Sequence, residues 1–310
     1  MPTKLRDVLL SGVEHLRRQQ LQTGDFPCVR TTGDAFYTPC TLVATLIHDS
    51  LAYFDPNCYL HQRAALDLFS ASDKGWLTPV VKTLRWRVRA FVAWQEDANG
   101  TWKLYGRQSS NGPDIATTAC AATVMLRTFT PPKRFVIRHV APMERSLRNR
   151  LHLFEKANVL RFLALAGQDL TNWTAHFSKE LTGLSPAGSD TLPFLCVAHA
   201  IARAWRQAAL PGHEAIADYL LPQILALQLT DGSFGRQLET ALAACALLDL
   251  GGPVPVLRET AAALMKFFER SEPWNAQPYW QLQVGSAAMT VAAALAALCR
   301  VGAITGGTFF

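Results

Sequence analysis

The sequence predicts an all-helical fold in which fully buried helices are surrounded by amphipathic ones. Apolar residues recur at spacings of three and four almost throughout the chain, and the alternating pattern of β-strands is nearly absent. A polar turn containing glycine also recurs between helices. The chain has 310 residues, of which 49% are apolar, so it can bury a large core. Because no long linker interrupts the pattern, we expect a single domain over residues 1–310.

The predicted helices are of two kinds. Thr240–Leu250 and Ala287–Leu298 lack a polar face and must be buried on all sides, whereas Leu5–Gln20 is amphipathic. An inner ring of buried helices inside an outer amphipathic ring satisfies both patterns. The helical spacing predicts Leu5–Gln20, Thr41–Tyr53, Pro79–Gln95, Thr117–Phe129, Glu144–Ala166, Leu192–Gln207, Glu214–Gln228, Leu238–Leu250, Val256–Glu269 and Gly285–Cys299.

Three segments repeat one order of residues: a glutamine at a helix end, a polar turn with glycine, and an aromatic residue. They are Gln22–Phe26, Gln95–Trp102 and Gln228–Phe234. Each is followed within about fifteen residues by a helix of small residues. Glycine supplies turn conformations that other residues resist, and glutamine can bond to unpaired groups at helix ends. The repetition predicts a chain built from repeated helical pairs.

Glutamine followed by Gly-x-Trp or Gly-x-Phe resembles the QW repeats of squalene-hopene cyclases and class II terpene cyclases. The resemblance covers nearly the whole chain, and the tail Trp274–Leu298 is similar to the closing unit of that family. It implies an α/α barrel, a toroid of six inner and six outer helices that is shared with protein prenyltransferase subunits. The length matches one such barrel, a stand-alone β domain.

The segment Pro113–Ala119 resembles the Asp-x-Asp-Thr-Thr motif of bacterial drimane-type sesquiterpene cyclases. Asp114, Thr117 and Thr118 align with the motif, and Ala116 stands where the family has its middle aspartate, the general acid. The motif begins twelve residues after Trp102, in the context that the family would have. The resemblance therefore identifies positions 114, 116, 117 and 118 as the catalytic positions.

Class II cyclisation begins with protonation of a carbon–carbon double bond, which needs a strong acid held in a dry cavity. A carboxylic acid in the first turn of a helix suits this chemistry, because the positive helix end stabilises its conjugate base. Asp114, Thr117 and Thr118 would orient such an acid. Ala116 cannot donate a proton, and losing a positioned acid costs about 10²–10⁴-fold in rate.

The resemblance implies a lyase or isomerase of isoprenoid biosynthesis that converts farnesyl diphosphate into a bicyclic drimane-type product. With Ala116, this form is expected to be an inactivated variant. Two alternatives stay open: a non-catalytic barrel that binds isoprenoids or lipids, and a cyclase of a longer or aryl-linked prenyl chain. Asp114 also suits a simple helix N-cap behind Pro113.

Aromatic faces stabilise carbocations, and arginines bind diphosphates. Trp102 is better suited to packing over its turn. The candidate substrate-binding residues are Phe36, Trp94, Trp102, Tyr105, Tyr279 and Trp280 for the hydrocarbon, and Arg30, Arg107 and Arg236 for the diphosphate.

No protein-derived metal site is expected. Mg²⁺ could accompany a diphosphate, but the aspartate-rich metal motif of class I terpene synthases is absent from the sequence. Zinc-dependent protein prenylation would need an Asp, Cys and His cluster, and only Cys245 and Asp249 lie near each other. The seven cysteines form no C-x-x-C pair, which indicates buried thiols.

The formal charge of +6 is concentrated in Lys82–Arg89 and Lys133–Arg161. Such segments are typical of a solvated helix face, and they also suit an anionic substrate or peripheral contact with an acidic membrane. No nucleic-acid motif is present, so we expect no nucleic-acid partner. A second copy of the chain and a phosphatase remain candidate partners. The polar start, Met1–Asp7, and the longest apolar stretch, Ser286–Cys299, predict a cytoplasmic protein without a signal peptide.

Overall fold

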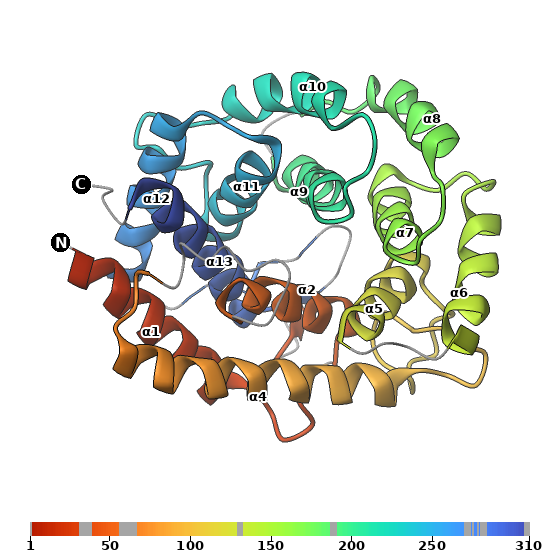
Figure 1. Cartoon of the computed structure of the whole chain (residues 1–310), viewed down its shortest axis with the longest axis horizontal. Helices are drawn as coiled ribbons and strands as arrows, with labels where there is room; N and C mark the ends of the chain where they lie inside the picture. Colours follow the sequence, from red (N-terminus) through yellow and green to blue (C-terminus); the bar gives the residue numbers. More distant parts are fainter. Residues whose placement is uncertain are drawn as a thin grey trace.

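A ring of helices inside a second layer of helices makes up the structure, a computed structural model (Figure 1). It describes residues 2–30, 39–55, 67–128, 133–186, 191–269, 274, 276–277, 279 and 284–306. Within those residues there are twelve α-helices, one 3-10 helix and one pair of two-residue strands, so the all-helical prediction is confirmed. The elements are α1 (Pro2–Gln19), β1 (Val29–Arg30), α2 (Thr41–Leu51), η1 (Ala52–Phe54), α4 (Ala71–Gln95), α5 (Ile115–Thr128), α6 (Lys133–Ser146), α7 (Leu153–Leu165), α8 (Thr171–Leu181), α9 (Leu192–Gln207), α10 (His213–Leu225), α11 (Gln237–Leu250), α12 (Val254–Glu269), β2 (Val284–Gly285) and α13 (Ala287–Thr305).

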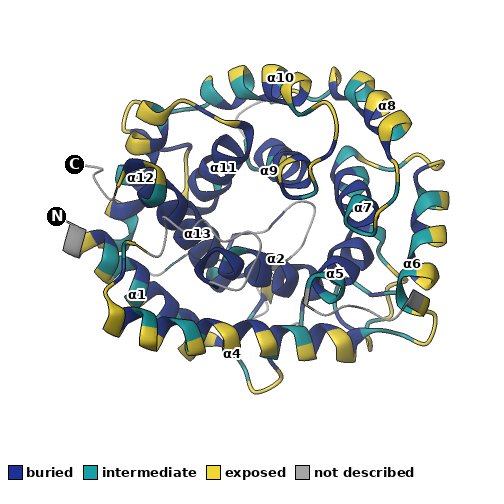
Figure 2. Ribbon diagram, viewed as in Figure 1, coloured by how far each residue is buried: buried dark blue, intermediate teal, exposed yellow. Residues whose placement is uncertain are grey.

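The inner ring consists of α2, α5, α7, α9, α11 and α13. Each contacts the next in that order, and α13 contacts α2, so the ring is closed (Figure 1). Nearly every residue of α11 and α13 is buried. These helices are rich in alanine, and small side chains let neighbouring helices approach on several sides at once. Figure 2 shows the inner ring as almost entirely buried.

The outer layer consists of α1, α4, α6, α8, α10 and α12, each packed against one or more helices of the ring. Their outward faces are exposed and their inward faces are buried (Figure 2). On α6, for example, Met143 is buried while Arg145 is exposed. The outer helices therefore supply the polar surface that the inner helices lack.

The predicted helix Glu144–Ala166 is wrong, because the structure has two helices there, α6 and α7. His152 starts α7: its ring nitrogen Nδ1 accepts from the Phe154 N–H at 3.3 Å, and its own N–H donates to the Glu155 carboxylate at 2.8 Å. Helix α8 was not predicted. It follows Asp169, whose carboxylate accepts from the Thr171 N–H at 3.0 Å. Both starts are local caps that apolar spacing does not register.

The three repeated turns have the same backbone geometry. In each, one N–H donates across the turn to a carbonyl four residues on, at 2.8 to 3.0 Å, and a glycine with positive φ completes the turn. The aromatic residue that follows is buried. The bonds join Leu21 to Asp25, Asp97 to Thr101, and Leu229 to Ser233, and the aromatic residues are Phe26, Trp102 and Phe234.

The glutamine of the first turn is Gln20 and not Gln22, so that part of the prediction is wrong. Gln20 Nε2 donates to the carbonyls of Gly24 at 2.9 Å and of Leu84 at 3.0 Å, whereas Gln22 is exposed. Gln228 Nε2 lies 3.4 Å from the carbonyl of Gly232, in the same arrangement. In the second turn, Gln95 lies one residue further from the turn bond than the other two glutamines do. Its side-chain oxygen Oε1 accepts from the Arg107 N–H.

The ring closes where the N-terminal part of the chain meets its C-terminal part. β1 and β2 pair antiparallel, with Val29 opposite Gly285, and Ser286 Oγ donates to the Pro27 carbonyl at 2.9 Å. Among the described helices, α13 alone is long and apolar enough to cross a membrane, but 83% of that apolar window is buried inside the protein. It is a core helix of the ring, as the sequence predicts for residues 286–299.

We expect Gly24→Ala to destabilise the protein by about 3 kcal/mol or more. Gly24 has φ of 97°, and a Cβ there would lie 2.2 Å from the Arg87 carbonyl oxygen on α4, so the outer helix would have to move. The measurement is the free energy of unfolding in urea.

Gly167→Ala is the matched control, since Gly167 has φ of 83° but no atom within 4 Å of the added Cβ. It should lose only about 1–2 kcal/mol from backbone strain. Equal losses in both variants would contradict a packing role for the turn at Gly24.

Candidate functional site

The N-terminus of α5 carries the predicted catalytic motif. The Asp114 carboxylate accepts from the Thr117 N–H at 2.6 Å, so Asp114 is the N-cap of the helix. The Asp114 N–H donates to the Trp102 carbonyl at 3.1 Å, which fixes the start of α5 to the second repeated turn. The capping role of Asp114 is thus present in the structure, and its support of an acid stays a prediction.

Ala116 is buried in the first turn of α5, with only 3% of its surface exposed. It lies one helical turn before Cys120, so the two side chains share a face of α5. The Cys120 thiol lies 3.1 Å from Asn158 Oδ1 on α7 and 3.9 Å from Arg203 Nη2 on α9. Position 116 therefore lies on the side of α5 that faces the inside of the ring. The buried hydroxyl of neighbouring Thr117 has no hydrogen-bond partner among the described residues.

Thr118 has a different environment, because its hydroxyl ties α5 to the second turn. It accepts from the Trp102 N–H at 3.1 Å and donates to the Asp114 carbonyl at 2.7 Å. In the third turn Thr240 accepts from the Phe234 N–H at 3.1 Å in the same way. The recurrence of this bond gives Thr118 a structural role that is independent of any chemistry at position 116.

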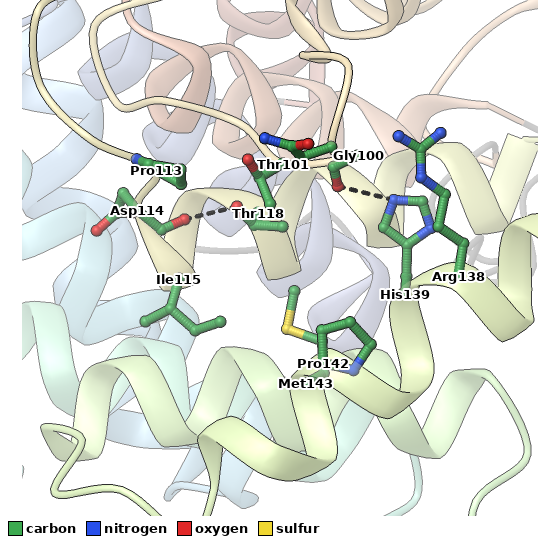
Figure 3. A pocket seen from close by; sticks show the side chains of 11 residues that line it. Gly100, Thr101, Pro113, Asp114, Ile115, Thr118, Arg138, His139, Pro142 and Met143 are labelled. Atoms are coloured by element: carbon green, nitrogen blue, oxygen red, sulfur yellow. Dashed lines mark hydrogen bonds between the residues drawn. The ribbon is translucent and has the colours of Figure 1, made fainter.

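A cavity of about 140 Å³ lies between α5 and α6 (Figure 3). Both nitrogens of His139 face carbonyl oxygens, those of Gly100 at 3.0 Å and Phe135 at 2.8 Å. The cavity lies between one helix of the inner ring and one of the outer layer, and Ala116 does not line it. Its walls include Asp114, Ile115 and Thr118 on the α5 side and Arg138, His139, Pro142 and Met143 on the α6 side.

A second site lies at the opposite end of the inner helices, where each helix of the ring contributes one charged side chain. All six residues lie within about the last turn and a half of their helices, and every side chain is at most 7% exposed. We call this set the central charge cluster. Its members are Asp49 on α2, Arg127 on α5, Arg161 on α7, Arg203 on α9, Asp249 on α11 and Arg300 on α13.

Two carboxylates share the four guanidinium groups of the central charge cluster. The Asp49 carboxylate lies 2.5 Å from Arg161, 3.5 Å from Arg203 and 3.8 Å from Arg127. Asp249 Oδ1 pairs with Arg300 Nη2 at 2.5 Å. The bonds from Arg161 to Asp49 Oδ2 and from Arg300 to Asp249 Oδ1 are charge-assisted, which is the strong kind, whereas the Arg127 contact at 3.8 Å is an ion pair without a hydrogen bond.

Neutral side chains bridge the charges. Gln207 Oε1 accepts from Arg161 Nη2 at 2.5 Å and from Arg127 Nη1 at 2.9 Å, while its Nε2 donates to the Tyr53 hydroxyl at 3.2 Å. The Arg300 guanidinium lies over the Tyr53 ring, 4.7 Å from its centre. These contacts link the two carboxylate groups into one network.

Burial and charge set the ionisation of this network. Burial raises the pKa of Asp49, but Arg161, Arg203 and Arg127 outweigh that effect and hold the pKa well below its usual range. Burial lowers the pKa of His48 to about 4, although Asp49 opposes this shift. Burial and the nearby arginines lower the pKa of His199 well below its usual value. At neutral pH Asp49 is therefore ionised and both histidines are neutral.

At the C-terminal ends of the inner helices the inside of the ring is polar, and the apolar cavity that cyclisation would need stays a prediction. A pocket of about 20 Å³ lies there, and its lining includes Asp49, Tyr53, Arg203, Gln207, Asp249 and Arg300. Sequence reasoning missed the central charge cluster. The available signal was a single charge near the end of an otherwise apolar helix, as in Ile47–Leu51 or Leu298–Val301.

The predicted aromatic residues fall in several places. Tyr279 is fully buried in the ring, edge-on to Phe154 and with its hydroxyl 3.4 Å from His199 Nδ1. Trp102 is also fully buried, and its Nε1 donates to the Val92 carbonyl at 2.7 Å, so it packs its turn onto α4.

Trp94 is 58% exposed on α4, so it does not line the interior of the ring and that prediction is wrong. Tyr105 is half-buried against the core. Phe36 and Trp280 lie outside the described residues.

Two of the arginines predicted to bind diphosphate lie in exposed turns before different inner helices. Arg107 and Arg236 are exposed in separate turns, one before α5 and one before α11. The Arg236 N–H donates to the Glu239 carboxylate at 2.6 Å at the start of α11. The backbone of Arg30 belongs to β1, and its side chain lies outside the described part of the structure. The converging arginines are those of the central charge cluster.

No group of three or more His, Cys, Asp or Glu residues that could hold a metal occurs in the described part of the chain. Burial raises the pKa of Cys245 to about 12, and Asp249 is paired with Arg300. The association of Mg²⁺ with a bound diphosphate stays a prediction.

No known family model matches the chain, and a comparison with curated proteins finds no match. The functional interpretation therefore depends on the motifs, the arrangement of the helices and the geometry of the two sites.

We expect Thr118→Val and Thr240→Val each to destabilise the protein by about 1–3 kcal/mol. Each change removes the acceptor of a buried backbone N–H, that of Trp102 or of Phe234. Thr123→Val is the control: its buried hydroxyl donates only to the Ala119 carbonyl within α5, so its loss should be below about 1 kcal/mol. Chemical denaturation measures all three. A loss at Thr123 equal to the other two would contradict the special role of the turn threonines.

Proposed function

We propose that the chain is an α/α barrel of the terpenoid cyclase type whose inner ring binds a linear isoprenoid diphosphate. The closed ring with its outer layer and the three matching turns support this proposal. The observation that carries it is the location of Ala116. This position is buried in the first turn of an inner helix and lies on its ring side, next to a capping aspartate.

An acid at position 116 would have the surroundings that alkene protonation needs. The N-terminus of α5 would stabilise the carboxylate left after proton transfer. The buried Thr117 hydroxyl, which has no partner among the described residues, could orient the acid. Water would be excluded because neighbouring residues are buried. The proposed activity is class II cyclisation of farnesyl diphosphate to a drimane-type product, and the form with Ala116 binds the substrate without protonating it.

A second candidate function is a non-catalytic barrel that binds isoprenoids or lipids. Two observations favour it. Asp114 is engaged as a helix cap, and the hydroxyl of Thr118 is engaged by the turn, so both have structural roles that need no catalysis. Under this function Ala116 is simply a buried small residue.

We expect Ala116→Asp to convert farnesyl diphosphate into a cyclised product, whereas the unaltered chain gives none. The gain should be at least about 10²-fold, since it supplies a positioned acid. Gas chromatography with mass detection after phosphatase treatment measures the product. Geranylgeranyl diphosphate in parallel tests the longer chain.

Ala116→Asn is the matched control, because it has the size of aspartate but cannot act as the acid. Absence of product from a folded Ala116→Asp variant would contradict the cyclase proposal. Farnesyl diphosphate binding in that variant would then favour the non-catalytic barrel.

A peripheral contact with an anionic membrane is a further part of this proposal. Trp76, Trp86 and Trp94 are exposed on the outward side of α4. Residues 74–94 of this helix contain no acidic residue, and four of their basic residues, Lys74, Lys82, Arg87 and Arg89, are at least partly exposed. Tryptophan favours the membrane interface, and basic residues are attracted to anionic lipids. An isoprenoid substrate dissolves in membranes, so such a contact would bring the ring to its substrate.

We expect the double variant Trp86→Ser/Trp94→Ser to bind vesicles of phosphatidylcholine and phosphatidylserine at least about tenfold more weakly. Co-sedimentation measures the bound fraction. Leu229→Ser is the control, since Leu229 is exposed in the turn that follows α10, a helix that lies across the ring from α4 (Figure 1). Unchanged binding of the double variant, or absence of any binding by the unaltered chain, would contradict the contact.

A further inference from the structure

The central charge cluster holds more positive than negative charge. Its four guanidinium groups face the two carboxylates of Asp49 and Asp249, which leaves an excess of two positive charges among the described residues of the cluster. The side chains are 1–7% exposed, so water does little to screen this excess. Buried charges in proteins are normally paired, and an unpaired one is costly.

Among the described residues, the titratable neighbours of the cluster do not supply the missing negative charge. His48 and His199 are neutral at neutral pH, and burial raises the pKa of Tyr53 to about 12. The carboxylate of Asp55 is paired with Arg85. The carbonyl ends of the inner helices lie beside the cluster and offset part of the positive charge, most strongly at Arg127 in the last turn of α5, but they carry only partial charges.

Several donors in the cluster have no acceptor. The buried Nε–H groups of Arg161, Arg203 and Arg300 have no hydrogen-bond partner among the described residues. Most buried N–H groups in proteins are paired, so three in one cluster indicate a missing acceptor. The side chains of Arg203 and Arg300 line the central pocket.

The Gln207 side chain occupies the place where an anionic oxygen would be expected. Its neutral carbonyl oxygen accepts from two guanidinium groups, those of Arg127 and Arg161. Guanidinium groups form stronger bonds with charged oxygens than with neutral ones. A single amide on α9 is thus a weak substitute for a phosphate or carboxylate oxygen.

We propose that the centre of the ring binds an oxyanion of the phosphate class, with one oxygen in the place of Gln207 Oε1. A dianion would balance the two excess charges, and the guanidinium forks suit phosphate oxygens. The present pocket, about 20 Å³, has room for one water molecule, so Gln207 must release Tyr53 and move aside. This site lies at the other end of α5 from Ala116 and does not depend on chemistry there.

Gln207→Glu tests the proposal, because it places a carboxylate where the anion would bind and keeps the side-chain size. In the unaltered chain, pyrophosphate at about 100 times its Kd should raise Tm by about 5 °C over potassium chloride of equal ionic strength. In Gln207→Glu, Tm without the anion should be higher, and the rise with pyrophosphate should be lost. Gln22→Glu makes the same change on an exposed residue and should behave like the unaltered chain.

Four ligands distinguish the source of the anion: inorganic phosphate, pyrophosphate, farnesyl diphosphate and farnesol. A rise in Tm with phosphate or pyrophosphate that Gln207→Glu abolishes supports a site for the free anion. A rise with farnesyl diphosphate alone, also abolished, supports a site for the diphosphate end of a prenyl chain.

Equal rises in the unaltered chain and in Gln207→Glu, or equal rises with farnesol and farnesyl diphosphate, would overturn the proposal. If Gln207→Glu does not fold, calorimetric titration of the unaltered chain with pyrophosphate and farnesyl diphosphate decides, and no binding of either overturns it. Failure of Ala116→Asp to cyclise farnesyl diphosphate would leave these results unaffected, so the two proposals fail separately.

Discussion

The structure depends on covering helices that have no polar face. In α11 and α13 almost every residue is buried, so each must contact other helices on all sides. A closed ring provides two neighbours for each inner helix, and an outer layer provides the rest. The repeated turns set the spacing between the layers: the glycine of each turn lies directly against the next outer helix, and the buried aromatic residue fills the joint. The central charge cluster then fills the described centre of the ring at the C-terminal ends of the inner helices.

The sequence predicts this layering well, because the apolar spacing of α11 and the repeated turns are local features. It predicts less well where a helix begins at a local cap. Apolar spacing merges α7, which begins after His152, with α6, and it misses α8, which begins after Asp169. It identifies Asp114 as a cap from its place behind Pro113. It could not reveal the central charge cluster, since Asp49 and Arg203 are 154 positions apart and only ring closure brings them together. Exposure of Trp94 was equally hidden, because it depends on which face of α4 meets the ring.

The two sites lie on one helix. Ala116 in the first turn of α5 and Arg127 near its end are separated by eleven residues, a rise of about 16 Å. Cys120 lies between them and contacts Asn158 and Arg203. Under the proposals above, an acid position and an anion site would lie at opposite ends of the same inner face. A linear isoprenoid diphosphate has its terminal double bond and its phosphate groups at opposite ends too, so the polarity of the ring would match that of its ligand.

The meeting of β1 with β2 bears on the order in which the protein can fold. During synthesis the N-terminal helices emerge first. Helix α2 gains one of its two ring neighbours, α13, only after residues 52–286 have been synthesised. Until then the apolar edge of α2 and the carboxylate of Asp249, which pairs with Arg300 on α13, lack their partners. The nascent chain is therefore an open arc with two unsatisfied edges, and arrival of α13 satisfies both in one cooperative step.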